Sequence, residues 1–267
     1  MKKLPDLYRI RYDHILTEKG KRYVDNINLI FKGEVELTEK IDGSQMAVSF
    51  KGGMPYLQSK NAHLPMNGKH PAFSGAWSWV WEHIEKIEKL KDVLLFGEWV
   101  KVQHSIPYDN LPDWFIVFDG WHRKQKRYMD RRELRKFTQK TGFTTAPVLY
   151  QGRIEYRDVP ALIENKKPTW SSSRYLNDLK FNDEELERIK NATSNKQPIR
   201  RFENGTINME GCVIKPAQNP KTKKIGKETI VWYNAGKVVV QAFLNETESD
   251  ADWMGHKQRF NRLAEWN

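Results

Sequence analysis

The chain contains a series of short apolar segments, each bounded by turn residues and many ending in a charged residue. Segments of this length with alternating polarity are typical of β-strands, and a turn as short as Lys51-Gly52-Gly53 is typical of a hairpin. The predicted strands are GEVELTEK, QMAVSF and MPYLQSK in the region 34–60, then 93–100, 113–121, 148–152, 210–216, 228–233 and 237–243. Strands that pair in hairpins, with helices kept apart from them, predict an α+β domain.

Apolar residues recur at helical spacing in four other regions. The first runs from Ala76 to Leu90 and is rich in tryptophan, which predicts a helix with one face in the core. The others are 130–141, which Gly142 ends, 158–165 and 183–192. The segments 196–208 and 217–227 are polar, and we expect mobile loops there.

Net charge and cysteine content narrow the class of protein. The charge of +11 favours polyanionic partners, with nucleic acid before a membrane surface. One cysteine excludes an internal disulfide and a metal site built from several thiolates. The N-terminus lacks the apolar run of a signal peptide, and no segment reaches transmembrane length. We therefore expect a soluble protein of a reducing compartment, the cytoplasm.

The motif Lys40-Ile41-Asp42-Gly43-Ser44 lies between two predicted strands. By itself it is a weak signal, because Asp-Gly is a common turn pair and a solvated hairpin turn explains it as well. The functional interpretation is a lysine nucleophile on a loop that its flanking strands keep rigid. Lysine attacks phosphorus only as the free amine, so this interpretation expects burial or nearby cations to disfavour its proton.

Four further segments place charged or aromatic residues in or at the ends of predicted strands. Each of them alone is explained as an ordinary strand end. In chain order they are Gln58-Ser59-Lys60, Phe96-Gly97-Glu98-Trp99, FIVFDG (115–120) and EGCVIKP (210–216). In this order, and together with the lysine motif, they form a specific pattern.

This pattern resembles the nucleotidyltransferase domain of the covalent-lysine superfamily, which includes RNA ligases, DNA ligases and messenger-RNA capping enzymes. RNA ligases fit best, and the likeness runs from about Leu7 to the C-terminus. It implies an α+β nucleotidyltransferase (adenylyltransferase) domain over 1–244, with antiparallel sheets flanked by helices in an ATP-grasp-like ligase core. About two dozen residues follow KVVVQAF, too few for an OB-fold, so 245–267 is expected to be a short tail packed on the domain.

The resemblance also implies roles for individual residues in binding ATP. Lys40 would attack the α-phosphorus, release pyrophosphate and carry AMP as a phosphoramidate. Glu39 would border the adenine pocket, Phe118 would stack on adenine, and Asp42 would belong to the nucleotide site. Lys60 stands where the family usually has an arginine that touches a phosphate or the 3′ side. A lysine there keeps the charge but loses the bidentate fork.

Two acids and a lysine are implied for the metal and the phosphates. Glu98 would bind the ribose hydroxyls or a metal-bound water, and Glu210 would orient hydrated Mg²⁺ (or Mn²⁺). Lys215 would neutralise phosphate charge. ATP and its leaving group carry dense negative charge, so lysines and a divalent cation are the expected partners. Magnesium keeps much of its water shell, so nearby carboxylates often act through water.

One region departs from the family pattern. The last motif of the family usually supplies two lysines after EGCVIKP, and by spacing these positions are Val231 and Tyr233 here. Neither side chain is cationic. We expect Lys237, or failing that Lys227, to supply the missing positive charge.

The hypothesis from the sequence is an ATP-dependent RNA ligase that joins 5′-phosphate and 3′-hydroxyl ends, as in RNA repair. The expected partner is nucleic acid, either RNA or a nicked duplex, and not a membrane; the oligomeric state is open. One alternative is a small ATP-dependent DNA ligase, and the other is a nucleic-acid-binding protein with a degenerate nucleotidyltransferase fold. The basic run 123–136 is either a solvated helix face or a phosphate contact.

Overall fold

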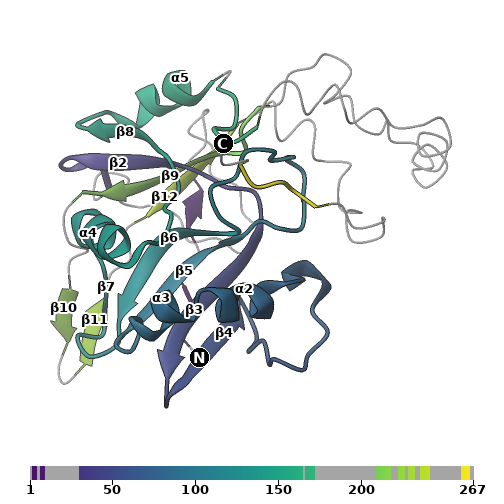
Figure 1. The fold of residues 1–267 in the computed structure, drawn as a ribbon. Coiled ribbons are helices and arrows are strands. Elements are labelled where there is room, and N and C mark those ends of the chain that lie inside the picture. The colour runs from purple at the N-terminus through teal and green to yellow at the C-terminus, as the bar shows by residue number, and fades with distance from the viewer. Residues whose placement is uncertain are drawn as a thin grey trace, which may run out of the picture.

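The computed structural model of this chain describes residues 2–4, 7–9, 30–164, 166–171, 208–217, 222–225, 228–231, 235–240 and 260–264. Its strands form two five-stranded sheets and a separate hairpin (Figure 1). The first sheet has the spatial order β1 (Tyr8–Arg9), β12 (Gly236–Val239), β9 (Gly211–Pro216), β2 (Val35–Glu39) and β8 (Val148–Gly152). The second has the order β4 (Met54–Ser59), β3 (Ser44–Lys51), β5 (Val93–Trp99), β6 (Phe115–His122) and β7 (Arg127–Tyr128).

Within these sheets neighbouring strands are antiparallel, except that β1 runs parallel to β12. The hairpin consists of β10 (Thr222–Ile225) and β11 (Glu228–Val231). The chain leaves the first sheet at Glu39 and enters the second at Ser44. The lysine motif is therefore the connection between the two sheets, as its position between two predicted strands requires.

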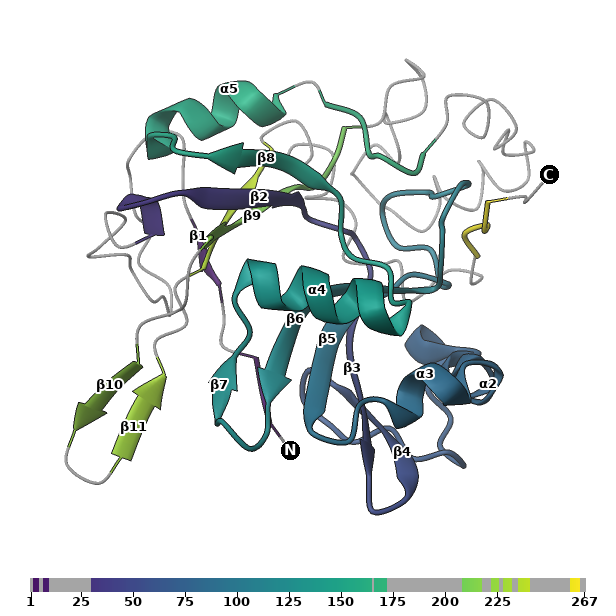
Figure 2. The same cartoon turned by 60° about the vertical axis from the view of Figure 1, so that its left-hand side comes forward.

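The helices cover the outer parts of this arrangement. They are η1 (Pro71–Phe73), α2 (Ala76–Glu82), α3 (Ile84–Glu88), α4 (Arg131–Thr141), η2 (Tyr156–Asp158) and α5 (Val159–Ile163). Figure 2 shows α5 beside β8 of the first sheet and α4 between the two sheets. The α+β class with antiparallel sheets and few helices is confirmed by this layout.

Each sheet buries its own apolar face. On the first sheet Val35, Leu37 and Ile214 pack against Val159 and Ile163 of α5. On the second sheet the apolar face packs against α2, α3 and α4 through a separate cluster that includes Val48, Leu95, Val117, Trp79, Ile87 and Leu134. Because side chains alternate along a strand, the other face of the first sheet carries Glu36, Thr38, Lys215 and Lys237. The polar face of the first sheet therefore looks toward the second sheet.

Helix α4 confirms the prediction for 130–141. Asp130 and Glu133 form a capping box at its start, in which each side chain accepts a hydrogen bond from the backbone N–H of the other residue. Gly142 ends it in the left-handed conformation, with φ of 78°. The helix is thus specified locally at both ends.

Three expectations need correction. The helix predicted over 76–90 breaks at His83, whose backbone leaves helical geometry while its ring stacks on Trp79 and its Nδ1 lies 2.8 Å from the Trp79 carbonyl oxygen. The helix predicted over 158–165 begins as the 3-10 turn η2, and α5 ends at Ile163. The loop predicted over 217–227 contains β10, because Thr222–Ile225 forms backbone hydrogen bonds with β11.

The strands predicted over 228–233 and 237–243 are separated by only three residues in the sequence. In the structure they belong to different units, since β11 pairs with β10 and β12 pairs with β9. The predicted helix 183–192, the predicted loop 196–208, Lys227 and Tyr233 lie outside the described residues. Among the helices that the structure describes, none combines the length and the apolar character needed to cross a membrane.

Candidate active site

The backbone around Lys40 is fixed by both sheets. The Lys40 amide donates to the Gly211 carbonyl oxygen at 2.9 Å, which joins the end of β2 to the start of β9. At Gly43 an added Cβ would lie 2.9 Å from the carbonyl oxygen of Trp99, so this position needs a glycine. The loop therefore passes close to the end of β5, next to Glu98.

The Lys40 ammonium lies in a cluster of carboxylates. Its Nζ is 2.5 Å from Oε1 of Glu210. Burial lowers the pKa of Lys40, but the charges of Glu210, Glu98 and Asp42 act in the opposite direction, and the pKa of Lys40 is raised. Burial thus disfavours the proton of this lysine, as expected, but the neighbouring carboxylates outweigh that effect. Acidic neighbours keep the ammonium charged.

Glu98 and Glu210 each have one carboxylate oxygen, Oε2, that is buried and has no hydrogen-bond partner among the described residues. Burial raises the pKa of Glu98 well above its usual range and raises that of Glu210 as well. A buried oxygen without a partner is unfavourable, and a cation with its water shell would supply one. These two acids are thus suited to a divalent metal ion.

In the described part of the chain, no group of three or more His, Cys, Asp or Glu side chains is arranged to hold a metal alone. Mg²⁺ is commonly bound by one or two carboxylates, several waters and the phosphates of a substrate. The pair Glu98 and Glu210 fits that mode of binding, in which a nucleotide would supply the remaining ligands.

Asp42 organises the loop 104–108 next to the nucleophile. Its Oδ2 accepts hydrogen bonds from the amides of Ser105 at 2.7 Å and Ile106 at 2.9 Å, and its own amide donates to the Tyr108 hydroxyl at 3.0 Å. Asn261 supports the same loop, because its Oδ1 accepts from the Tyr108 amide and its Nδ2 donates to the Val100 carbonyl oxygen. Asp42 thus contributes to the shape of the site as well as to its charge.

His104 closes one side of the loop. Its Nε2 lies 3.0 Å from the Ser44 hydroxyl and its Nδ1 lies 3.8 Å from Oδ1 of Asp42. Burial lowers the pKa of His104 to about 4, so its ring is neutral at pH 7. A neutral imidazole in this place acts as a hydrogen-bonding group rather than as a positive charge.

The residues expected around adenine occupy two different surroundings. Glu39 is buried, and its carboxylate accepts hydrogen bonds from the backbone amide and the hydroxyl of Thr169; burial raises its pKa. Phe118 lies on β6 and packs, half-buried, against an apolar cluster with Phe96 and Leu94. Phe118 is on the second sheet, whereas Glu39 belongs to the first.

The three lysines expected to contact phosphates are placed differently from one another. Lys215 donates to Oδ2 of Asp119 at 2.6 Å and to the Phe118 carbonyl oxygen at 3.1 Å, and burial lowers its pKa to about 8. Lys237 lies on β12, and its charge lowers the pKa of Glu210, which places it within electrostatic range of the carboxylate cluster. Lys60 is exposed just beyond the end of β4.

The structure describes one of the two positions, Val231 and Tyr233, at which a lysine was expected from the family pattern. Val231 ends β11 in the separate hairpin, and Tyr233 is outside the described residues. Lys237 is paired across the sheet with Val213, two positions before Lys215. The polar face of the first sheet therefore presents Lys215 and Lys237 on neighbouring strands.

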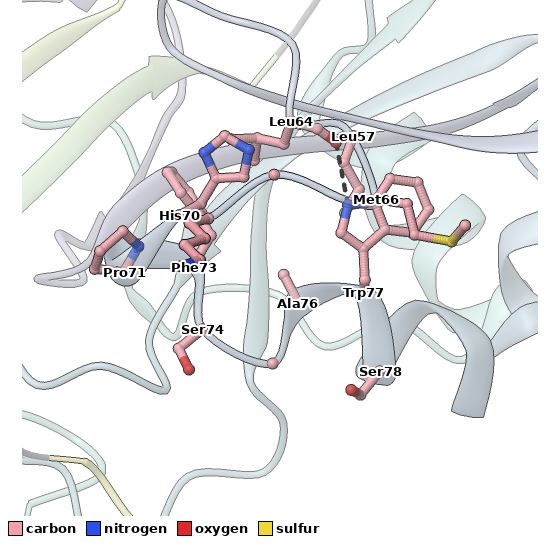
Figure 3. Close-up of a pocket in the computed structure, with 13 residues that line it drawn as sticks. Leu57, Leu64, Met66, His70, Pro71, Phe73, Ser74, Ala76, Trp77 and Ser78 are labelled. Carbon is pink, nitrogen blue, oxygen red and sulfur yellow. Dashed lines mark hydrogen bonds between the residues drawn. The ribbon is translucent and has the colours of Figure 1, made fainter.

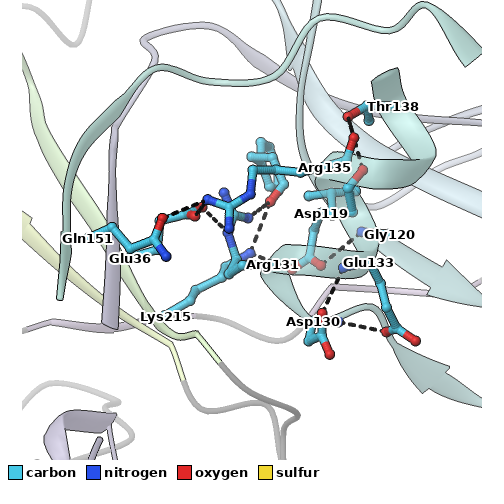
Figure 4. A network of polar contacts seen from close by, with 12 residues as sticks. Glu36, Asp119, Gly120, Asp130, Arg131, Glu133, Arg135, Thr138, Gln151 and Lys215 are labelled. Atoms are coloured by element: carbon cyan, nitrogen blue, oxygen red, sulfur yellow. Dashed lines mark hydrogen bonds and ion pairs between the residues drawn. The ribbon is translucent and has the colours of Figure 1, made fainter. Parts of the chain in front are cut away.

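A network of charged side chains that includes Glu36, Arg131 and Lys215 joins the two sheets (Figure 4). Arg131 donates from Nε to Oε1 of Glu36 at 2.6 Å, and Arg135 binds the other oxygen of the same carboxylate. Lys215 and Asp119 form a further ion pair of the network. Arg131 comes from the basic run 123–136 but is only 4% exposed, so for this residue a solvated helix face is wrong.

A pocket of about 400 Å³ lies on the second sheet between β4 and α2 (Figure 3). Leu57, Leu64, Met66, Phe73 and Trp77 are among its lining residues, and the Trp77 indole N–H donates to the Leu64 carbonyl oxygen at 3.1 Å. Lys40, Glu98 and Glu210 do not line it. The candidate active site is therefore identified by its charges and hydrogen bonds, and not by this pocket.

Several residues of the site were missed by sequence reasoning. Tyr108 and Asn261 are far apart in the sequence and meet only through the fold, and Glu36 was not singled out from the strand that contains it. Arg131 was one basic residue among many. The sequence contains one usable signal, since an acid at a position alternating with Val35 and Leu37 would face the polar side of the sheet.

Comparison with known proteins gives two positive results. A family model described as RNA ligase matches residues 33–230, which is most of the chain. No curated protein matches the sequence. Among solved structures, a variant of the Naegleria gruberi RNA ligase with ATP and Mn matches with a TM-score of 0.55 and 14% identity, covering 92% of this chain and 58% of that chain.

Other structures of the Naegleria gruberi ligase match this chain with similar TM-scores. A second variant with ATP and Mn gives a TM-score of 0.55 and 16% identity over 93% of this chain and 59% of that chain. The ligase with PPi gives a TM-score of 0.53 and 17% identity over 93% of this chain and 58% of that chain. At these identities the likeness shows the fold, and this chain spans less than two thirds of the length of those proteins.

Proposed function

The chain belongs to the RNA ligase family, and we propose that it is an ATP-dependent enzyme that joins a 5′-phosphate end to a 3′-hydroxyl end of RNA. The observation that carries this proposal is the Lys40 ammonium, 2.5 Å from Glu210, in a site where Glu98 and Glu210 each have a buried oxygen with no hydrogen-bond partner in the described part of the chain. A lysine nucleophile and two acids suited to a cation are the minimum that nucleotidyl transfer to lysine needs.

In the first step the Lys40 nitrogen forms a bond to the α-phosphorus of ATP while the bond from that phosphorus to the pyrophosphate oxygen breaks. The ammonium must lose a proton beforehand, and Glu210 is in hydrogen-bond contact to accept it. A divalent cation held by Glu98 and Glu210, Mg²⁺ or Mn²⁺, would offset negative charge on the phosphates and on the two acids. Less negative charge around Lys40 favours the free amine, which the nucleophile requires.

Two further transfers complete the proposed reaction. A 5′-phosphate oxygen of one RNA end attacks the phosphorus of the lysyl-AMP, which frees Lys40 and leaves the 5′ end adenylated. The 3′-hydroxyl of the second end then attacks the 5′-phosphate and AMP leaves. Lys237 and Lys215, on neighbouring strands of the polar face, are proposed to contact phosphate oxygens.

The finer assignment of the fold belongs to the same proposal. We assign the two sheets to a nucleotidyltransferase core of the ATP-grasp-like ligase type, with adenine between the sheets, Phe118 on one side and the edge of the first sheet near Glu39 on the other. The family match and the TM-scores with the Naegleria gruberi ligase support this assignment.

The test is transfer of label from α-³²P-ATP to the protein in the presence of MgCl₂, detected on a denaturing gel. Wild-type protein should carry covalent label, Lys40→Ala should carry none, and Lys89→Ala, at an exposed lysine, should label as wild type. Labelled Lys40→Ala would overturn the choice of nucleophile. Label transfer without sealing of RNA, but with sealing of nicked DNA, would identify a small DNA ligase instead.

A further inference from the structure

Phe118 occupies an irregular position in the second sheet. Phe96 of β5 pairs with Asp119 of β6, but the next residue, Gly97, pairs with Val117, so Phe118 has no partner on β5. This is a β-bulge, which re-aims a side chain and leaves the backbone groups of the extra residue outside the ladder. The bulge coincides with a close approach of the strands, since a Cβ on Gly97 would lie 2.5 Å from the Ile116 carbonyl oxygen.

The carbonyl oxygen of the bulged residue is bound by two cations. Arg131 donates to it from Nη1 at 2.8 Å, and Lys215 donates from Nζ at 3.1 Å. Arg131 comes from α4 and Lys215 from β9, so side chains of two other elements bind the backbone of the bulge in the second sheet. Hydrogen bonds from charged donors are stronger than neutral ones, which makes them suited to fixing a backbone group outside a ladder.

Arg131 is itself fixed by Glu36. The guanidinium reaches the Phe118 carbonyl with Nη1 and Glu36 with Nε at 2.6 Å, so one planar group joins β6 to β2 (Figure 4). Glu36 is 1% exposed and its second oxygen is bound by Arg135. A lysine has no second donor at a fixed angle, so it could not hold both partners in one geometry.

Stability alone does not explain this arrangement. Buried ion pairs are often no more stabilising than apolar residues of similar volume, because desolvation of the charges offsets their attraction. A link between the polar face of the first sheet and one backbone carbonyl holds the backbone from which the Phe118 ring projects, which a purely apolar contact does not do.

We propose that Arg131, oriented by Glu36, is a positioning residue that sets the affinity for ATP by fixing the bulge that carries the Phe118 ring. Arg131 acts through the backbone of Phe118 and does not touch the nucleotide. This inference rests on the proposed function, in which Phe118 stacks on adenine.

The experiment measures the rate of covalent label transfer as a function of ATP concentration in wild type, Arg131→Lys and Arg132→Lys. Arg132 is the neighbouring exposed arginine of the same helix and provides a matched control. Arg131→Lys should raise the KM for ATP by roughly five- to tenfold, part of the effect of losing a base–aromatic stack. Its rate at saturating ATP should stay within about twofold of wild type, and Arg132→Lys should change neither quantity.

Repeating the measurement in Phe118→Ala protein separates a positioning role of Arg131 from general damage to the site. In Phe118→Ala protein there is no ring to position, so adding Arg131→Lys should leave the KM for ATP unchanged. The KM for ATP is compared between variants whose circular dichroism shows folded protein, because reversible unfolding itself raises the ATP concentration that gives half-maximal labelling. A KM of Arg131→Lys within twofold of wild type, or an equal rise in both backgrounds, would overturn the inference. Unlabelled wild-type protein would instead refute the proposed function.

Discussion

Replacing Asp42 by alanine should destabilise the protein through the loop next to the nucleophile. The change removes the carboxylate that accepts from the amides of Ser105 and Ile106, so two partly buried donors lose this charged acceptor. Because both donors are only partly buried, the loss of each hydrogen bond should cost about 1–2 kcal/mol, so the expected loss of unfolding free energy is about 2–4 kcal/mol. Asp42→Asn keeps an acceptor oxygen without the charge and should lose roughly half as much.

The assay is thermal unfolding of ligand-free protein followed by circular dichroism. A destabilisation of this size lowers the Tm of a chain of this length by about 5–10 °C. Asp92→Ala is a suitable control, because the Asp92 carboxylate binds the exposed Lys124 and should contribute little. If the Tm of Asp42→Ala lies within about 1 °C of wild type, the two amides do not depend on Asp42 and the reasoning is wrong.

Three further predictions concern charge. Lys237→Ala should slow label transfer by on the order of a hundredfold. A structure of the wild-type protein with ATP in which the Lys237 ammonium lies beyond hydrogen-bond reach of every phosphate oxygen would contradict its proposed role. Because burial lowers the pKa of Lys215 to about 8, ATP affinity should fall as the pH rises through that value, and Lys215→Arg, measured by the same titration, should move the fall to higher pH. The raised pKa of Glu98 means that the folded state binds its proton more tightly than the unfolded state, so stability should decrease as the pH rises above about 4.5. Urea unfolding from pH 5 to 8 should show a weaker decrease for Glu98→Gln, and an identical slope would contradict the assignment.

Local patterns were enough to predict much of the fold. The strands around Lys40 follow from alternation and from short Gly-containing turns, and α4 follows from helical spacing closed by Asp130 and Gly142. His83 was not recognised as a break because the apolar spacing continues through it, and the break depends on its ring packing against Trp79. Local sequence does not contain that contact.

The sequence predicted which residues belong to the candidate site, but it did not predict the charged state of Lys40. The motifs that include Lys40, Glu98 and Glu210 identified groups that the structure brings together. The charged state of Lys40 was not predictable, because it depends on how close three carboxylates from separate segments lie. The hydrogen bond from Arg131 to Glu36 joins residues that are 95 positions apart in the sequence. Nothing in the basic run 123–136 distinguishes Arg131, which the fold buries, from its neighbours.

The face of the first sheet opposite its apolar cluster carries Glu36, Thr38, Lys215 and Lys237, and none of these side chains is part of that cluster. A substitution at these positions therefore opens no cavity in the apolar cluster of this sheet, and its effect on folding comes through hydrogen bonds and ion pairs instead. Natural selection can then alter base choice, metal preference or substrate strand at these positions almost independently of the sequence that maintains the fold. Relatives of this chain should accordingly differ more in the residues between the sheets that are not needed for catalysis than in the volumes of their outer cores.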